Sequence, residues 1–217
     1  MARRNPPPID EVRLIYDREA HGFDARFQAD PRTVARFRLF DAPHKSIAAG
    51  ARRVLELGCG SGRLLAQLDG GIRIGIDVSG GLLAVAWAKG LCVVHGDAQR
   101  LPFPDGSFDA VCSGNAVFRH LDYERTFAEC VRVLQPGGRL AVQQYAARPF
   151  RLRAGPPPSD LDLDNLHDML RPARAAGLIE ERVFLWRNLR FPPYALPLPR
   201  PVAWRLWTQA VFVFRKL

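Results

Sequence analysis

Apolar residues at the start of the chain recur at the three- and four-residue spacing that is typical of amphipathic helices. Two segments, 9–16 and 33–40, carry this pattern, and Pro31 and Pro43 stand where we expect helices to break. Residues 1–50 are therefore predicted to form a helical N-terminal cap.

From residue 51 onward, short apolar runs alternate with helix-like segments. The runs expected to be strands are 53–57, 72–76, 91–94, 108–112, 139–143, 179–186 and 208–215. The segments expected to be helices are 64–68, 82–89, 123–134 and 161–170. Alternating strands and helices are typical of βαβ units, which build a parallel sheet with helices on both faces. The predicted fold class is therefore α/β, with a Rossmann-like, mostly parallel sheet of seven strands.

The strongest chemical signal is a glycine loop after the first expected strand, Val54-Leu-Glu-Leu-Gly-Cys-Gly-Ser-Gly62. Alternating glycines let the backbone turn sharply and approach a ligand, and a following helix N-terminus presents free N–H groups. A dinucleotide fingerprint would have glycine at position 63, where this chain has Arg63. The acidic Glu56 also suits a ligand with an ammonium group better than one with a pyrophosphate.

Two further carboxylates follow the next strands. Asp77 closes the second strand about twenty residues after the first glycine, where a carboxylate can accept both hydroxyls of a ribose. Aspartate also caps helices, and Ser79 could cap the helix expected here. Asp97 ends the third strand, beside the same crevice.

Charge and composition exclude few classes of protein. The 217 residues carry 31 Lys and Arg against 22 Asp and Glu, a net charge of +9. Such a charge could attract nucleic acid, anionic lipid or an acidic substrate. The arginines are spread along the whole chain rather than gathered in one block, which favours solvated surface positions.

The sequence shows no pattern of a signal peptide, a membrane span, a disulfide framework or a zinc site. No apolar run approaches the roughly 20 residues of a membrane span, and no apolar region follows the basic N-terminus as in a secretory signal. The four cysteines are scattered without a C-x-x-C pair, which indicates reduced thiols rather than a zinc site or disulfides. We therefore expect a cytoplasmic protein without a metal.

Four motifs in register resemble the class I S-adenosylmethionine-dependent methyltransferases. They are E-L-G-C-G-S-G at 56–62, G-I-D-V-S at 75–79, G-D-A-Q-R-L-P-F-P-D-G-S-F-D-A-V at 96–111 and R-V-L-Q-P-G-G-R-L at 132–140. More narrowly, the chain is similar to the branch of ubiquinone/menaquinone-type and natural-product small-molecule methyltransferases.

The resemblance implies a single domain over residues 1–217. Residues 1–50 would form the cap and 51–144 the cofactor-binding core. Residues 145–217 would supply substrate-side loops and the last two strands, the final strand being antiparallel.

The cofactor implied by the resemblance is S-adenosyl-L-methionine, and its product is S-adenosyl-L-homocysteine. Glu56, Gly58 and Gly60 would hold the methionine end, and Gly62 would keep the loop tight. Asn115 would reach the cofactor's amino group or the transferring methyl.

The nucleoside end would lie against the next two strands. Asp77 would bind the ribose hydroxyls, and Val78 would pack on the adenine. Asp97 would accept the adenine amino group, and Ala98 would contribute a backbone contact.

The cap carries its own pattern. Ile15-Tyr-Asp17 and Gly22-Phe-Asp24 resemble the Y-D…Y-D pattern of the family's N-terminal cap. Phe23 replaces the second Tyr, so no hydroxyl is available there.

The methyl acceptor is expected outside the carboxyl ends of the parallel strands. His120, placed in the helix after the fourth strand, is the candidate general base, although it could instead cap or pack that helix. Tyr16 and Tyr145 are rival candidates, as orienting hydroxyls or aromatic walls.

Two Pro-rich segments could also face the acceptor. Arg148, with Arg151 and Arg153, could bind a carboxylate or phosphate, or could be a solvated loop arginine. Tyr194 belongs to an aromatic and leucine-rich stretch, 191–207, that suggests either an apolar lid or a surface for a partner or membrane.

We therefore expect methylation of an O, N or C atom of a small-molecule acceptor by in-line displacement, in a monomer or homodimer that binds no nucleic acid. An RNA- or protein-modifying methyltransferase remains open because of the net charge, although no separate RNA-binding module is visible. A cofactor-binding, non-catalytic partner subunit also remains open, although the intact glycine loop and Asp77 argue against lost binding.

Overall fold

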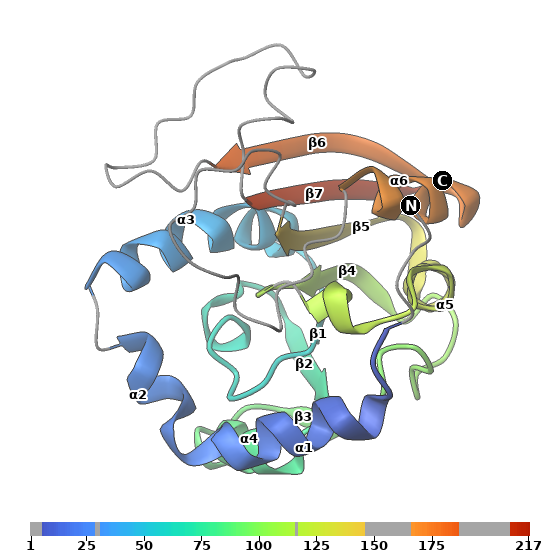
Figure 1. Cartoon of the computed structure of the whole chain (residues 1–217). Coiled ribbons are helices and arrows are strands. Elements are labelled where there is room, and N and C mark those ends of the chain that lie inside the picture. The colour runs from blue at the N-terminus through green and yellow to red at the C-terminus, as the bar shows by residue number, and fades with distance from the viewer. Residues whose placement is uncertain (1–5, 29–30, 116, 146–165, 187–208) are drawn as a thin grey trace, which may run out of the picture.

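A computed structural model describes residues 6–28, 31–115, 117–145, 166–186 and 209–217. Seven strands form one sheet in the order β3-β2-β1-β4-β5-β7-β6 (Figure 1). The strands are β1 (Arg53–Leu57), β2 (Ile72–Asp77), β3 (Val93–His95), β4 (Phe108–Ser113), β5 (Leu134–Tyr145), β6 (Leu178–Trp186) and β7 (Gln209–Lys216). All neighbours from β3 to β5 pair in parallel, whereas β7 is antiparallel to both β5 and β6. The predicted Rossmann-like sheet is therefore confirmed.

Helices cover both faces of this sheet. They are α1 (Ile9–Glu19), α2 (Phe23–Gln28), α3 (Pro31–Ala48), α4 (Gly80–Ala88), α5 (Tyr123–Val133) and α6 (Leu166–Ala175). Single 3-10 turns occur at η1 (Ala20–Gly22), η2 (Leu65–Gln67) and η3 (Val117–His120). Within these described segments, no helix is long and apolar enough to cross a membrane.

The core has two parts because side chains alternate along each strand. In β1, Val54 packs with α3 residues such as Ile47, whereas Leu55 packs with α5 residues such as Phe127. The sheet is thus buried on both faces, which explains why its strands read as nearly continuous apolar runs. Polar side chains are left at the carboxyl ends of the strands.

Two expectations about helices were wrong. Pro43 lies inside α3 rather than at its end, and the helix continues because Phe40 and Ile47, on either side of the proline, are buried. Residues 64–68 form only the turn η2, because the segment is short and is followed by Gly70 and Gly71.

The position of His120 also needs correction. It lies in η3, a separate 3-10 turn, rather than in the helix after the fourth strand. That helix, α5, begins only at Tyr123, because the side chain of Asp122 caps it by accepting the N–H of Arg125 at 2.9 Å.

Candidate functional site

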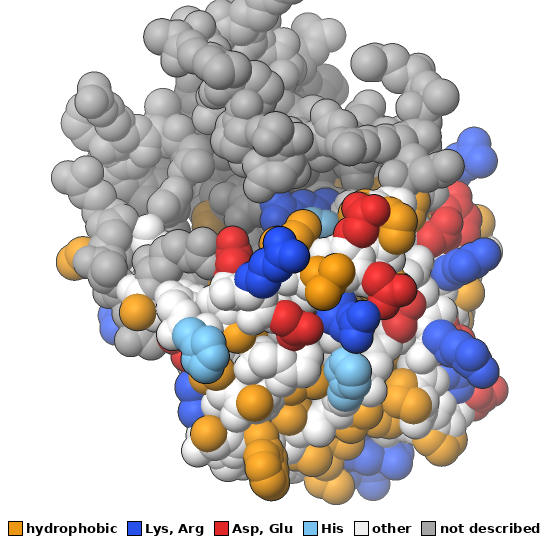
Figure 2. Space-filling model, turned by 60° about the horizontal axis from the view of Figure 1, so that its bottom comes forward, with side chains coloured by type: hydrophobic (Ala, Val, Ile, Leu, Met, Phe, Trp, Pro, Cys, Tyr) orange, Lys and Arg blue, Asp and Glu red, His pale blue; other side chains and the backbone are white. Residues whose placement is uncertain are grey.

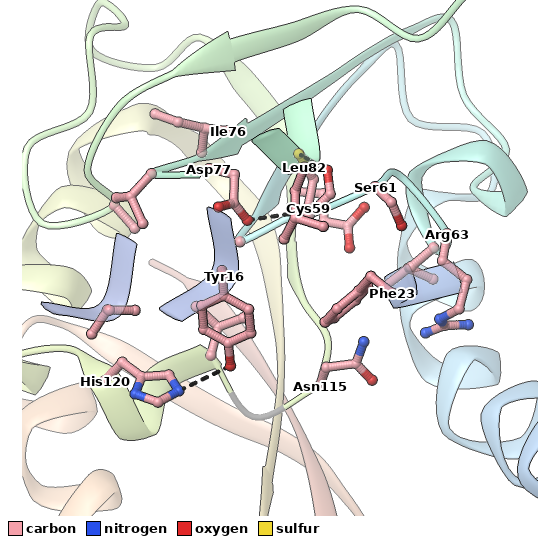
Figure 3. Close-up of a pocket in the computed structure, with 18 of the residues that line it drawn as sticks. Tyr16, Phe23, Cys59, Ser61, Arg63, Ile76, Asp77, Leu82, Asn115 and His120 are labelled. Carbon is pink, nitrogen blue, oxygen red and sulfur yellow. Dashed lines mark hydrogen bonds between the residues drawn. The ribbon is translucent and has the colours of Figure 1, made fainter. Parts of the chain in front are cut away.

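A pocket lies at the carboxyl ends of β1, β2 and β4, and its lining includes side chains of α1 and α2 (Figure 3). The cap contributes Ile9, Val12, Tyr16, Phe23 and Asp24. The opposite wall is built from the glycine loop, the end of β2 and the segment after β4. This is the edge of the sheet where open α/β proteins bind ligands.

The glycine loop depends on backbone angles that other residues rarely adopt. Gly58, Gly60 and Gly62 have φ angles of 62°, 52° and 80°. A Cβ atom on Gly58 would lie 2.4 Å from Val117, and one on Gly62 would lie 2.1 Å from Leu91. A Cβ atom on Gly60 would meet nothing closer than 3.5 Å. Gly58 and Gly60 line the pocket, whereas Gly62 instead permits packing behind the loop.

Asp77 joins the two loops that border the pocket. Its Oδ2 accepts the N–H of Gly60 at 2.8 Å, and its Oδ1 accepts the N–H of Ser79 at 2.9 Å. The two oxygens offer about four acceptor positions in all, so the carboxylate can still accept a hydrogen bond from a ligand. Burial raises the pKa of Asp77, although these N–H groups act in the opposite direction.

Glu56 presents an unsatisfied acceptor to the pocket. Its side chain lies on β1 and is 3% exposed, and its Oε2 atom has no hydrogen-bond partner among the described residues. Burial raises the pKa of Glu56 well above its usual range. A buried carboxylate without a partner is unfavourable by itself and becomes favourable beside a cation.

Asn115 is strained and points into the pocket (Figure 3). In the described part of the chain it is the one non-glycine residue with a positive φ angle, 54°. Asparagine tolerates this region better than most residues, but such conformations cost about 1–3 kcal/mol and cluster at functional sites. The N–H of Asn115 donates to Oε1 of Gln143 at 3.0 Å, and the buried Oδ1 of Asn115 has no partner among the described residues.

Of the residues expected at the nucleoside end, some line the pocket and one does not. Val78 and Ala98 line the pocket, as does Gly96. Asp97 is not among the lining residues, and its carboxylate accepts the backbone N–H of Gln99 at 2.8 Å. A direct role of Asp97 toward a ligand therefore stays a prediction.

Tyr16 and His120 meet at the wall of the pocket. The Tyr16 hydroxyl lies 3.2 Å from Nε2 of His120, and the two rings are edge-to-face. Nε of Arg119 donates to the same Nε2 at 2.9 Å. Nε2 of His120 therefore acts as a hydrogen-bond acceptor in this arrangement. His120 thus has a lone pair at Nε2, and that lone pair is already engaged.

The first aromatic–aspartate pair of the cap has a clear geometry. Tyr16 lines the pocket, while Asp17 turns toward the N-terminus of α4. Oδ1 of Asp17 accepts the hydroxyl of Ser79 at 2.7 Å and the N–H of Gly81 at 2.9 Å. The bond from Ser79 lowers the pKa of Asp17. The pair therefore ties α1 to the loop after β2.

The second pair repeats this arrangement on the glycine loop. Phe23 lines the pocket, and Asp24 accepts hydrogen bonds from the Ser61 hydroxyl and the Lys89 ammonium group. Burial raises the pKa of Asp24, but the bonds from Lys89 and Ser61 outweigh it and lower the pKa. The loss of the tyrosine hydroxyl at Phe23 leaves this attachment intact.

Several expected residues have no described position. The side chain of Tyr145, the whole of Arg148 and Tyr194, and the segments 146–165 and 187–208 lie outside the described residues. Arg119 and Gln143, by contrast, were not predicted from the sequence to be site residues. Gln143 could have been recognised as an amide that interrupts the apolar pattern of its strand.

The sheet order and the glycine loop define a Rossmann-like α/β protein. A family model described as "Methyltransferase domain" matches residues 55–142. The chain is 33% identical over 161 residues to the demethylmenaquinone methyltransferase of Mycobacterium sp. (strain KMS), covering 72% of this chain and 68% of that protein. It therefore belongs to the class I S-adenosylmethionine-dependent methyltransferases, which confirms the resemblance of the four motifs.

Other relatives match a smaller part. The demethylmenaquinone methyltransferase of Thermus thermophilus is 40% identical over 108 residues, which are 45% of this chain and 49% of that protein. This match thus spans about half the length of that relative.

Two solved structures resemble the chain over nearly its whole length. The [4+2]-cyclase SpnF has a TM-score of 0.72 at 23% identity, covering 98% of this chain and 97% of its own. Geranyl diphosphate C-methyltransferase from Streptomyces coelicolor A3(2), in complex with S-adenosyl-L-homocysteine, has a TM-score of 0.69 at 14% identity, covering 98% and 100%. At these identities the likeness concerns the fold alone.

Proposed function

We propose that the protein transfers the methyl group of S-adenosyl-L-methionine to an apolar small-molecule acceptor. The observation that carries the proposal is the pocket itself. There the unpaired oxygen of Glu56, the carboxylate of Asp77 and the open face of Gly60 share one cavity with Tyr16 and His120.

The residues present fit the cofactor by their chemistry. Glu56 and Asn115 offer an ammonium group buried oxygens that have no partner among the described residues, and Asp77 offers its remaining acceptor capacity to ribose hydroxyls. Val78 and Ala98 offer apolar surface to an adenine. When bound, the cofactor supplies a methyl group that is already activated on a sulfonium.

The chain's own contribution to the reaction would be position and exclusion of water. Displacement of an activated methyl group needs the acceptor atom in line, so most of the acceleration can come from holding the reactants together. Tyr16 and Phe23, which are in edge-to-face contact with ring centroids 6.1 Å apart, would form part of the wall that shields the reaction.

The acceptor class follows from the cap. Ile9, Val12, Tyr16 and Phe23 of the cap give the pocket an apolar surface, to which Leu121, just after η3, adds. Because the relatives at 33–40% identity are named demethylmenaquinone methyltransferases, demethylmenaquinone is the first acceptor to test. A screen of pooled apolar metabolites with radiolabelled cofactor would extend the search.

The alternative of a nucleic-acid substrate lacks a matching surface on the face in view. There, basic and acidic side chains are interspersed over the described part of the molecule (Figure 2). A phosphate-binding face would gather basic groups of one sign, and its binding would weaken steeply with salt.

The donor site is tested by calorimetry with S-adenosyl-L-homocysteine. Gly60→Val should fill space that the cofactor needs, and Asp77→Ala should remove the ribose contact, so both should weaken binding at least tenfold. Gly90→Val is the matched control, because Gly90 also has a positive φ of 76° but lies outside the pocket lining. Unchanged affinity in both site variants would refute the proposed donor site.

A further inference from the structure

Gln143 is a polar residue at a buried position of β5, where an apolar side chain is expected. Its neighbours Leu140, Ala141 and Val142 are fully buried, and Gln143 itself is 1% exposed. Burial of an amide is unfavourable unless its polar atoms are bonded, and Nε2 of Gln143 has no partner among the described residues. The bond from the N–H of Asn115 to its Oε1, at 3.0 Å, is therefore the feature that explains this side chain.

The bond holds one end of a short turn. Asn115 has a φ angle of 54°, a backbone conformation that is unfavourable unless other interactions stabilise it. At the other end, Nε2 of the buried His44 lies within hydrogen-bond distance, 3.1 Å, of the carbonyl oxygen of Ser113. Side chains from β5 and α3 thus fix residues 113–115 from two elements.

The turn decides where Asn115 points. Its side chain projects into the pocket (Figure 3), and its buried Oδ1 has no partner within the described part of the chain. Glu56 presents a second unpaired acceptor to the same pocket. Two unpaired acceptors suit an ammonium group, which has only donors.

We propose that Gln143 is a positioning residue of the donor site. It holds Asn115 in the left-handed conformation that directs Oδ1 toward the amino group of the cofactor. Gln143 is not among the residues that line the pocket, so it acts through Asn115. The inference rests on the proposed function, and it assigns a role to a residue that would not touch the ligand.

Gln143→Met tests the role, because methionine has a similar length and no strong hydrogen-bonding group. We expect the Kd for S-adenosyl-L-homocysteine to rise roughly 3- to 10-fold, the range of one lost hydrogen bond. Gln144→Met is the matched control. Gln144 is also 1% exposed, but its amide donates to the Tyr123 hydroxyl at 2.8 Å, and Tyr123 is not among the pocket-lining residues. This variant should lower the thermal midpoint and leave the Kd unchanged.

A double-mutant cycle separates positioning from a general structural effect. If Gln143 acts through Asn115, adding Gln143→Met to Asn115→Ala should weaken binding no further. A stability measurement gives a second readout without ligand. Glycine adopts positive φ without help, so Gln143→Met should lower the thermal midpoint less in the Asn115→Gly background than in the wild-type background.

The outcomes distinguish this inference from the proposed function. Additive losses, or an unchanged Kd for Gln143→Met while the wild-type protein binds, would remove the positioning role and leave the donor site in place. A wild-type protein that does not bind S-adenosyl-L-homocysteine would overturn both. If Gln143→Met does not fold, equal destabilisation by Gln143→Asn in the two Asn115 backgrounds would also count against the role.

Discussion

At the scale of single residues, the pocket keeps groups that make the protein alone less stable. Glu56 is buried with an unpaired oxygen, and Asn115 is held in a strained conformation. Both features reduce the stability of the folded protein, as is common at functional sites, and a bound ligand would offset that loss. Replacing either should therefore separate stability from binding.

Glu56→Gln should show this separation most clearly. Because burial raises the pKa of Glu56, the folded protein holds this proton more tightly than the unfolded chain. The stability that this proton contributes is present below the unfolded pKa of 4.5 and is lost as pH rises through the raised folded pKa. At neutral pH, Glu56→Gln should thus raise the thermal midpoint and weaken S-adenosyl-L-homocysteine binding.

Calorimetry over a range of pH provides the check on Glu56. Wild-type affinity should increase with pH as Glu56 becomes ionised, and binding should release protons to the buffer. The variant should lose much of both effects. A variant that is less stable than wild type at neutral pH would contradict the account.

His120→Ala tests whether a base contributes. To act as the base, Nε2 of His120 must exchange the bond from Arg119 for the acceptor's proton. In that case turnover of the variant should fall by roughly 100-fold or more, while its affinity for S-adenosyl-L-homocysteine stays the same. Tyr16→Phe, which removes the hydroxyl 3.2 Å from that nitrogen, should have a smaller effect. Near-normal turnover of His120→Ala would assign the histidine to packing and leave the chemistry to proximity.

At the scale of elements, the cap is joined to the loops that it covers. Asp17 bonds the loop after β2, and Asp24 bonds the glycine loop, each one residue after an aromatic side chain of the pocket. Two attachments of this kind link the position of α1 and α2 to the donor site. A ligand beneath them should then leave only when the attachments open.

Asp17→Ala and Asp24→Ala should therefore speed the release of S-adenosyl-L-homocysteine. Loss of the charge-assisted bonds should raise the dissociation rate constant by roughly tenfold in each variant. Stopped-flow displacement measures this rate. Asp10→Ala is the control, because Asp10 lies on the exposed side of α1 and pairs only with Arg13 among the described residues. If Asp17→Ala and Asp24→Ala release the ligand no faster than Asp10→Ala, the cap does not control release.

At the scale of the whole molecule, stability should be distributed unevenly. The central strands are buried on both faces, whereas α1 exposes Leu14 and Ile15 and is fixed to the core at a few points. Elements with few buried contacts open first. A ligand that binds only the folded protein raises the stability of the whole.

Hydrogen exchange should reveal this distribution. The amides of β1 should be protected with and without ligand, while those of residues 9–28 should exchange faster and slow down when S-adenosyl-L-homocysteine is added. Mass spectrometry of peptides would resolve the two regions. Equal protection of α1 in both states would mean that the cap is ordered independently of the donor site.

The sequence alone determined the sheet, the glycine loop and the family. These features depend on short contiguous segments, because strand periodicity and backbone freedom at Gly58 and Gly60 are local properties. The aromatic–aspartate pairs of the cap were visible as a motif, but their purpose was not. Helix boundaries failed where packing outweighed local preference, as at Pro43 within α3.

Only the tertiary structure decided which side chains act together. Asp17 bonds Ser79 across 62 positions of the chain, Asp24 bonds Lys89 across 65, and Asn115 bonds Gln143 across 28. No periodicity connects residues so far apart, because their proximity results from the parallel crossovers that bring the carboxyl ends of the strands to one edge. The donor motif could therefore be predicted from the sequence, whereas the roles of Asp17, Asp24 and Gln143, which hold or cover it, could be identified only from the fold.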